Sequence, residues 1–182
     1  MNIVVYADGY LQAGDKVYRA TYGHNGIGKK HREGDGISPE GVWPLRRAFY
    51  RSDRMEKPET GLPIDVLKPN YAWSDVESDP QYNQLVMLPN PVIEEHLWRE
   101  DGLYDLFVVI GYNDDPIIVG KGSGILLHVA RPEFSPSAGC ACVSLPDLLE
   151  IAPHLDRDST LEFTSKTLKG EAVKWPYKAP MD

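Results

Sequence analysis

The chain has 182 residues, of which 42% are hydrophobic, and this suits one globular domain with a proper core over residues 1–182. A formal net charge of -8 at pH 7 argues against a general nucleic-acid-binding protein, which needs a basic surface to displace counterions. No segment approaches the roughly 18 apolar residues of a membrane span, and the N-terminal residues lack the basic leader and long apolar stretch of a secretory signal.

The first half of the chain is expected to hold a hairpin, a long loop, one strand and an irregular insertion. Short apolar segments at residues 3–7 and 16–22 flank a turn-prone stretch, which predicts the hairpin. Residues 23–45 are dense in glycine, proline and charge without a regular period, so a loop is predicted there, followed by a strand over 46–54. Six prolines between residues 57 and 91 break any long helix and predict the insertion.

The second half is expected to alternate short helices with buried strands. Residues 93–101 and 144–155 have apolar side chains at helical spacing, and the second of these segments opens on Ser-Leu-Pro, a typical helix start. Residues 102–114 and 122–130 contain the continuous apolar runs typical of buried strands, and residues 159–167 alternate as a final strand. The pattern indicates a mainly β fold with two small helices.

His128, Cys140 and Cys142 are the residues best suited to carry chemistry. Cys140 lies shortly before a predicted helix start, and the positive end of a helix dipole favours a thiolate. His128 ends a predicted strand 12 residues upstream, so a loop can return its imidazole to the sulfur. Two alternatives stay open. One is a buried cysteine beside a structural histidine, and the other is a metal site that His154 or an acid completes.

Two segments resemble the YkuD-type L,D-transpeptidase catalytic domain. One is GKKHREGDGISPEGVWPL at residues 28–45, which is similar to the family element G-D-G-x-T-P-x-G-x-F, with Ser38 and Trp43 at the Thr and Phe positions. The other is GSGILLHVARPEFSPSAGCACV at residues 122–143, which is similar to the family's histidine followed by S-H-G-C, with Ser137, Gly139 and Cys140 at the Ser, Gly and Cys positions. The two elements occur in the family's order, and the resemblance extends over roughly residues 3–165.

The resemblance implies a mainly β, YkuD-like barrel or sandwich with the cysteine in a cleft. Cys140 as thiolate would attack the carbonyl at the L-centre of meso-diaminopimelate, expel D-alanine and form a thioester, which passes to an amine of a neighbouring stem peptide. His128 would move the proton, and the main-chain carbonyl of Val129 would orient its ring. The N–H groups of Gly139 and Cys140 would face the developing oxyanion.

The sequence departs from the family motif at two positions. The family's second histidine is replaced by Ala138, and the position two after the cysteine, commonly Arg or Asn, is Cys142. In an extended segment Cys140 and Cys142 face the same side. We expect Arg131, three residues after His128, to replace the missing anion-binding group, because a guanidinium can hold a carboxylate in two bonds.

Further residues are candidates for contact with the substrate, because they offer aromatic, amide or hydroxyl groups near the expected cleft. Besides Arg131 they are Trp73, Tyr82, Asn83, Tyr112 and Ser137. Asp75 or Asp79 would meet an ammonium group. The alternative is that these aromatic residues only pack the insertion onto the barrel.

The resemblance predicts a peptidoglycan L,D-transpeptidase that uses stem peptides of the meso-diaminopimelate type as donor and acceptor, with no metal or organic cofactor. Its crosslinks would be of the 3,3 or the 1,3 type. One alternative is an L,D-carboxypeptidase or endopeptidase with water as acceptor. Another is a catalytically inactive peptidoglycan-binding module, which Ala138 and Cys142 motivate. The substrate places the expected site of action in the periplasm.

Overall fold

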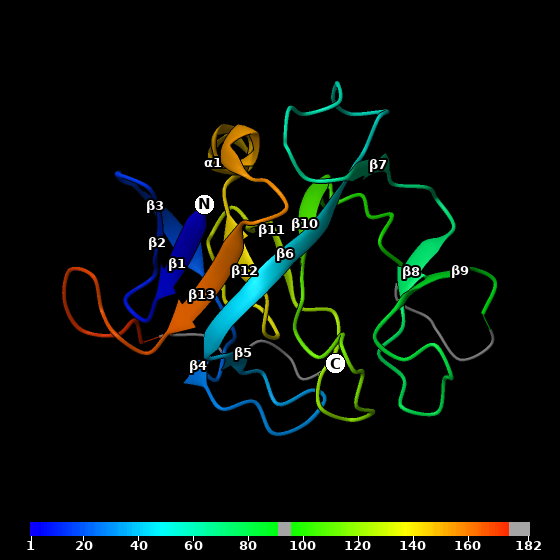
Figure 1. The fold of residues 1–182 in the computed structure, drawn as a ribbon, viewed down its shortest axis with the longest axis horizontal. Helices are drawn as coiled ribbons and strands as arrows, with labels where there is room; N and C mark the ends of the chain where they lie inside the picture. The colour runs from blue at the N-terminus through cyan, green and yellow to red at the C-terminus, as the bar shows by residue number, and fades with distance from the viewer. Residues whose placement is uncertain (91–95, 175–182) are drawn as a thin grey trace.

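The chain folds around a nine-stranded mixed sheet that closes into a barrel (Figure 1). The computed structural model describes residues 1–90 and 96–174. The strands of this sheet are β1 (Asn2–Tyr6), β2 (Tyr10–Ala13), β3 (Lys16–Thr21), β6 (Gly41–Tyr50), β7 (Ile64–Val66), β10 (Leu106–Ile110), β11 (Leu126–Val129), β12 (Ala141–Val143) and β13 (Thr160–Thr164). Two short pairs stand apart from it, β4 (Ile27–Gly28) with β5 (Ser38–Pro39) and β8 (Tyr71–Trp73) with β9 (Leu85–Met87).

Closure of the barrel depends on β6, which is long enough to reach two partners. Its first residues pair with β13, and its later residues, from Leu45 onward, pair with β10. From β10 the sheet runs through β11, β12, β3, β2 and β1 back to β13, so each strand of the ring has a neighbour on both sides. β7 lies outside the ring, parallel to the end of β6.

Both faces of β10 are buried, because alternate residues of a strand point to opposite sides and each side is covered. Leu106, Val108 and Ile110 belong to the main core, whereas Phe107 and Val109 belong to a second hydrophobic cluster. This outer cluster consists of Phe49, Leu67, Leu97, Phe107, Val109 and Leu126, with Tyr71, Trp73, Leu85, Trp98, Tyr104 and Cys140 packed against it. The insertion and the segment that follows it therefore cover the outside of the barrel.

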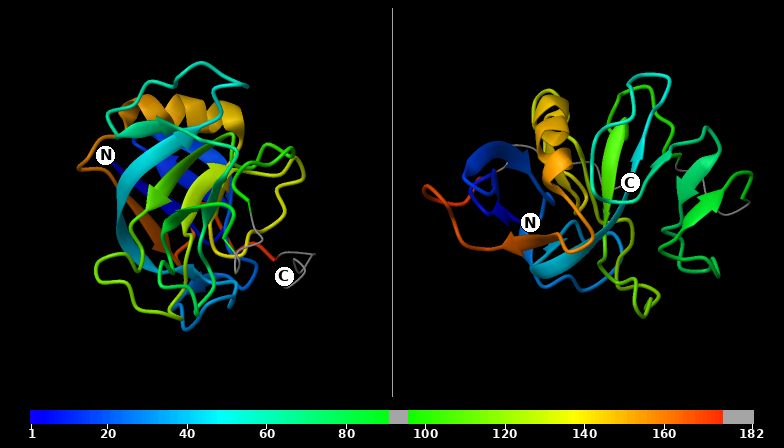
Figure 2. Two further views of the ribbon diagram at one scale, coloured as in Figure 1. Left: turned by 90° about the vertical axis from the view of Figure 1, so that its right-hand side faces the viewer. Right: turned by 45° about the horizontal axis from the view of Figure 1, so that its top comes forward.

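One α-helix, α1 (Leu145–Ile151), lies across an end of the barrel and continues into a 3-10 turn, η1 (Ala152–His154) (Figure 2). As predicted, the helix follows Ser144, whose side chain accepts a hydrogen bond from the Asp147 N–H at 3.2 Å. Leu148 and Ile151 pack into the main core. Among the described residues, no helix is both long and apolar enough to cross a membrane.

The prediction of a mainly β fold is confirmed. The strands expected within residues 102–114, 122–130 and 159–167 are β10, β11 and β13. Up to residue 90, the described limit before the gap, the insertion is irregular apart from β7 and the β8–β9 pair.

Several local predictions are wrong. The two strands expected in the first hairpin do not pair, because β2 forms within the supposed turn and lies between β1 and β3. Residues 41–45 belong to β6, since pairing with β13 fixes a segment whose Gly and Pro are typical of a loop. Residues 96–101 of the expected helix form a bridge from His96 to Ala72 followed by bends, while residues 93–95 lie outside the described residues. β12 was not predicted.

Candidate active site

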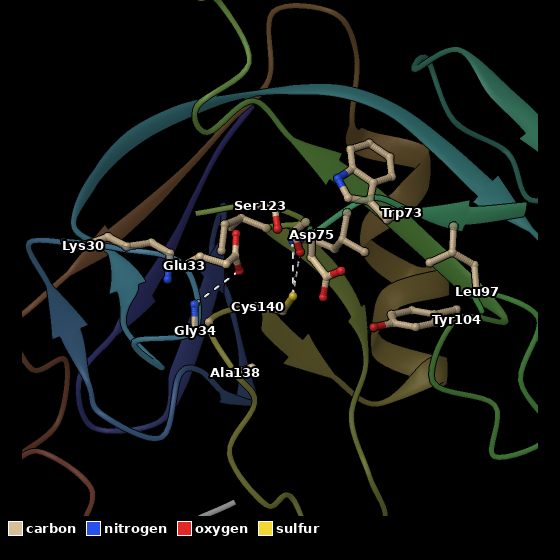
Figure 3. Close-up of a pocket in the computed structure, with 14 residues that line it drawn as sticks. Lys30, Glu33, Gly34, Trp73, Asp75, Leu97, Tyr104, Ser123, Ala138 and Cys140 are labelled. Carbon is tan, nitrogen blue, oxygen red and sulfur yellow. Dashed lines mark hydrogen bonds between the residues drawn. The ribbon is translucent and has the colours of Figure 1, made fainter. Parts of the chain in front are cut away.

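Cys140 lies in a cleft, directly before β12, with its sulfur between two backbone groups of the segment that leads into β11. The thiol donates to the Gly124 carbonyl at 3.2 Å, and the Leu126 N–H donates to the sulfur at 3.4 Å (Figure 3). The side chain is half-buried and packs against the outer cluster. An N–H group aimed at sulfur favours negative charge on it. The thiol is therefore accessible and next to a donor that stabilises its thiolate.

A tight turn before the cysteine is held by Ser137. Its hydroxyl donates to the Cys140 carbonyl at 2.7 Å and accepts from the Gly139 N–H at 3.0 Å. Gly139 has a φ of 151°, and a Cβ there would stand 3.1 Å from the Ile37 carbonyl oxygen, so glycine suits both the conformation and the space. The Ser137 hydroxyl thus serves the turn rather than the cleft. The Gly139 N–H, expected to face an oxyanion, points at Ser137 instead.

The two motifs that resemble the family form one unit. Ser38, fully buried on β5, donates to the Gly139 carbonyl at 2.7 Å and accepts from the Gly23 N–H at 2.9 Å. The Ser137 carbonyl oxygen lies 2.8 Å from the backbone nitrogen of His24 and 3.0 Å from its ring Nδ1. Segments far apart in the sequence therefore fix the turn that carries the cysteine.

His128 is buried on β11 with both ring nitrogens in contact with polar atoms. Nδ1 lies 2.9 Å from the Val129 carbonyl oxygen, and because a carbonyl only accepts, this nitrogen carries the hydrogen. Nε2 lies 3.4 Å from the sulfur of Cys142. Tyr104, which lines the cleft, packs edge-on against the ring at a centroid distance of 5.1 Å. Burial lowers the pKa of His128 to about 4, so the ring is neutral at pH 7 and its Nε2 carries no hydrogen.

The two cysteines differ in access and in proton affinity. Cys142 is 3% exposed, and burial raises the pKa of its thiol, which therefore stays protonated. Cys140, in contrast, lines the cleft. A nucleophilic cysteine must be reachable and must form a thiolate, so of the two Cys140 is the one suited to attack a carbonyl.

The cleft is bounded by the loop of Lys30 and Glu33 on one side of Cys140 and by Trp73, Leu97 and Tyr104 on the other (Figure 3). It is lined by Lys30, Glu33, Gly34, Trp73, Asp75, Leu97, Tyr104, Ser123, Gly124, Ile125, Leu126, Ala138, Gly139 and Cys140.

Lys30 does not leave a free positive charge in this cleft. Its ammonium group and the Asp35 carboxylate form a buried ion pair at 2.6 Å. Burial tends to raise the pKa of Asp35, but hydrogen bonds from Lys30 and from backbone N–H groups hold it below its usual range. The remaining charged groups that line the cleft are the carboxylates of Glu33 and Asp75. The cleft therefore favours a positively charged group beside Cys140.

The structure divides the residues expected in the insertion between two roles. Trp73 and Asp75 line the cleft. Asp79 is buried and accepts from the Ser74 hydroxyl at 2.7 Å, which makes it part of the loop's own scaffold.

Tyr82 and Asn83 hold the insertion onto the barrel rather than facing the cleft. Tyr82 is 1% exposed and donates to Glu33, and burial, followed by that carboxylate, raises its pKa. Asn83 Oδ1 accepts from Trp73 Nε1 at 3.0 Å and from the Gly124 N–H at 2.9 Å, while its Nδ2 donates to two carbonyls after β10. These bonds use the hydrogen-bonding capacity of the amide.

Tyr112 and Arg131 are not among the described residues that line the Cys140 cleft. Tyr112 packs edge-on against Trp43 at 5.0 Å and donates to the Lys121 carbonyl at 2.8 Å. Arg131 is exposed on the loop after β11. Arg131 therefore does not supply an anion-binding group in this cleft, contrary to the prediction.

Sequence reasoning missed Lys30, Glu33, Leu97, Tyr104 and Ser123 as cleft residues. They come from three separate loops. Lys30, Glu33 and Ser123 lie within the segments that resemble the family, but no period or spacing marks any of the five as a cleft residue. The metal alternative needs Cys140, Cys142 and His128 to converge with a further ligand. Over residues 1–90 and 96–174, no three His, Cys, Asp or Glu side chains are placed to hold a metal ion.

The family model described as the YkuD L,D-transpeptidase catalytic domain matches residues 3–169, which is nearly the whole chain. Searches of the curated proteins and of the solved structures gave no match.

Proposed function

The chain belongs to the YkuD family of L,D-transpeptidase catalytic domains, and on this basis we propose that it crosslinks peptidoglycan stem peptides through a thioester on Cys140. The observation that carries the proposal is the position of the Cys140 thiol, which lines the cleft between the Gly124 carbonyl and the Leu126 N–H. Cys142, two residues later, is buried and stays protonated.

In the first step the Cys140 sulfur forms a bond to the carbonyl carbon at the L-centre of meso-diaminopimelate. The bond to the terminal D-alanine breaks, and D-alanine leaves as an amine that takes up the proton given up by the thiol. In the second step an acceptor amine attacks the thioester, the sulfur leaves and the amine loses a proton. We assign the movement of these protons to His128, whose ring is neutral and whose Nε2 lies against the Cys142 sulfur at rest, so Nε2 must exchange that contact for the reacting groups at Cys140.

The two carboxylates of the cleft support an acceptor that arrives with an ammonium group. Glu33 and Asp75 line the cleft on opposite sides of Cys140 in Figure 3. Each attracts a cation, and in a partly enclosed cleft this attraction is screened less than in open water. The amine of a stem peptide, of the meso-diaminopimelate type or at an N-terminal alanine, fits this charge, and it must lose its proton before it attacks.

Transfer to an amine and transfer to water share the same thioester. A carboxypeptidase or endopeptidase would release the shortened stem without a crosslink, whereas a binding module would form no thioester at all. The family acts on the cell wall, which supports an extracytoplasmic site of action, and we propose the periplasm as that site.

Intact mass spectrometry tests the proposal. The chain is incubated with purified muropeptides and, separately, with a carbapenem, which acylates nucleophilic cysteines. We expect an adduct that peptide mapping places on Cys140, together with crosslinked muropeptides. Cys140→Ala and the more conservative Cys140→Ser should lose the thioester while keeping the fold by circular dichroism.

Three results would replace the proposal. Shortened stems without crosslinks, even in excess acceptor, would identify a hydrolase. Muropeptide binding that persists in Cys140→Ala, with no adduct in the wild type, would identify a binding module. An adduct on Cys142 would identify Cys142, and not Cys140, as the nucleophile.

A further inference from the structure

Three polar side chains lie in a row across the sheet, on the face that carries Cys140. Thr21 of β3 is the register partner of Cys142 on β12, and Cys142 is the register partner of His128 on β11. Register partners in neighbouring strands point to the same face. All three are buried, with exposures of 0%, 3% and 5%.

The hydrogen-bond direction in this row is determined at one end. Because Nδ1 of His128 donates to the Val129 carbonyl, Nε2 of the neutral ring can only accept. The Cys142 sulfur, 3.4 Å away, must then supply the hydrogen. Burial keeps this thiol protonated and the ring neutral, so the resting pair is a thiol that donates to an imidazole.

The Cys142 thiol also has a second acceptor. The carbonyl oxygen of Cys140 lies 4.0 Å from the Cys142 sulfur. When Nε2 of His128 gains a proton, the ring becomes a donor at that nitrogen. The Cys142 sulfur can accept this hydrogen bond only if the hydrogen of the Cys142 thiol points in another direction. The Cys140 carbonyl is positioned to receive that hydrogen.

Thr21 supplies a further buried group beside the sulfur. Its Oγ1 has no hydrogen-bond partner of ordinary geometry among the described residues. The hydroxyl lies close enough to the Cys142 thiol to lower the pKa of that thiol, against the larger opposing effect of burial. Thr21 is the register partner of Cys142, so its hydroxyl can donate a hydrogen bond to the Cys142 sulfur when the thiol hydrogen turns away.

We propose that Cys142 is a positioning residue for His128, and that its thiol donates to Nε2 of the neutral ring and turns to the Cys140 carbonyl when the ring takes up a proton. The inference rests on the proposed function, because it assigns His128 the role of base for Cys140. Cys142 itself gives up no proton to the substrate. Instead it lets one buried imidazole exist in both protonation states.

Other charged groups near His128 act on both states and must be kept constant in any test. They are Arg99 and Asp101 from the segment before β10 and Arg131 from the loop after β11, and the uncharged ring of Tyr104 packs beside them. Substitutions at Cys142 change none of these.

The first measurement is the nitrogen NMR spectrum of His128 in full-length protein with labelled histidine, recorded against pH. We expect a ring protonated at Nδ1, with Nε2 as a hydrogen-bonded acceptor. In Cys142→Ala the Nε2 resonance should move toward that of a nitrogen without a donor, and Cys142→Ser should restore it. A wild-type ring protonated at Nε2, or a resonance unmoved in Cys142→Ala, would overturn the proposal.

The second measurement is the rate at which iodoacetamide alkylates Cys140, followed by peptide mass spectrometry across pH. Loss of the acceptor for the protonated Nε2 should slow alkylation about tenfold in Cys142→Ala, because a hydrogen bond to a charged donor is worth more than one to a neutral donor. Cys142→Ser should recover the rate to within about threefold, since its hydroxyl can also donate or accept. Equal rates in all three proteins would overturn the proposal.

These tests separate the inference from the proposed function. Neither the spectrum nor the alkylation rate needs peptidoglycan, so both decide the role of Cys142 even if no muropeptide adduct forms. If Cys142→Ala does not fold, Cys142→Val provides a second variant without a donor.

Discussion

Strands β10 and β11 have an inner face that packs into the main core and an outer face that carries His128. On the inner face Leu106, Val108 and Leu127 fill the main core. On the outer face Phe107 and His128 are register partners, and Tyr104 packs edge-on against both rings. Neighbouring residues of one strand thus support either the barrel or the proposed base, His128. Because residues on both faces are buried, burial alone does not distinguish a core residue from a residue that supports the site.

The largest expected effect comes from truncating one residue on each face. Phe107 stacks on Phe49 at 5.2 Å and meets Tyr104 at 5.7 Å, and Tyr104 in turn packs on His128. We expect Phe107→Ala to lower the free energy of unfolding by about 3–5 kcal/mol and Leu127→Ala by about 2–5 kcal/mol, because both leave cavities. Urea unfolding measures these losses.

Turnover then separates the two faces. Under conditions in which both variants are fully folded, Phe107→Ala should slow the reaction of Cys140, since the support of Tyr104 and His128 is lost. Leu127→Ala should react like the wild type. Equal loss of rate in the two variants would show that the two faces are coupled, and would contradict the division of roles between them.

The pH dependence of stability gives the next largest effect. The pKa of His128 lies at about 4 in the folded chain, against an ordinary value of 6.5. Between these values the unfolded chain binds more protons, so the free energy of unfolding falls as pH drops from 6.5 to 4 and is insensitive to this group above 6.5. The difference corresponds to about 3 kcal/mol at most.

Urea denaturation between pH 4 and pH 7 measures this slope, with His128→Gln as the matched control. The variant should be less stable at pH 7 and should show a shallower loss toward pH 4. If both proteins have the same slope, other groups dominate and the ring is not held neutral by burial.

The smallest effect is expected at the contact between the two motifs. Ser38→Ala removes the hydroxyl that bonds both the Gly139 carbonyl and the Gly23 N–H. Both buried backbone groups then lose this hydrogen-bond partner. We expect a loss of about 1–3 kcal/mol in the free energy of unfolding and slower alkylation of Cys140. The control Ser135→Ala, at a half-buried loop hydroxyl, should change stability by less than about 0.5 kcal/mol. Unchanged alkylation in Ser38→Ala would show that the turn holds its shape alone.

Much of the fold could be predicted from local patterns. The apolar runs of β10 and β11 and the Ser144 start of α1 carry strong signals of their own. In contrast, β12 has only three residues, and β6 begins within a Gly- and Pro-rich stretch. Both are defined by neighbours distant in the sequence, which no local period can reveal.

The candidate site could be predicted only in part, and for a similar reason. The motifs identify Cys140 and His128 as candidates, but the cleft is completed by Glu33 and Tyr104, which tertiary packing brings there. Tyr82 and Asn83 offered suitable groups for a peptide, yet they satisfy buried hydrogen bonds of the insertion. In the sequence, a polar loop residue that hydrogen-bonds the backbone looks the same as one that binds a ligand.

The closed ring of strands also bears on self-association. An open sheet exposes unpaired N–H and C=O groups along its margins, and these can template pairing with another chain. Here the ring strands have neighbours on both sides, and β7, at the margin, is only three residues long. Asp65 of β7 is exposed and paired with Arg47, which places charge on that margin. The barrel is therefore protected against edge-to-edge aggregation at high protein concentration.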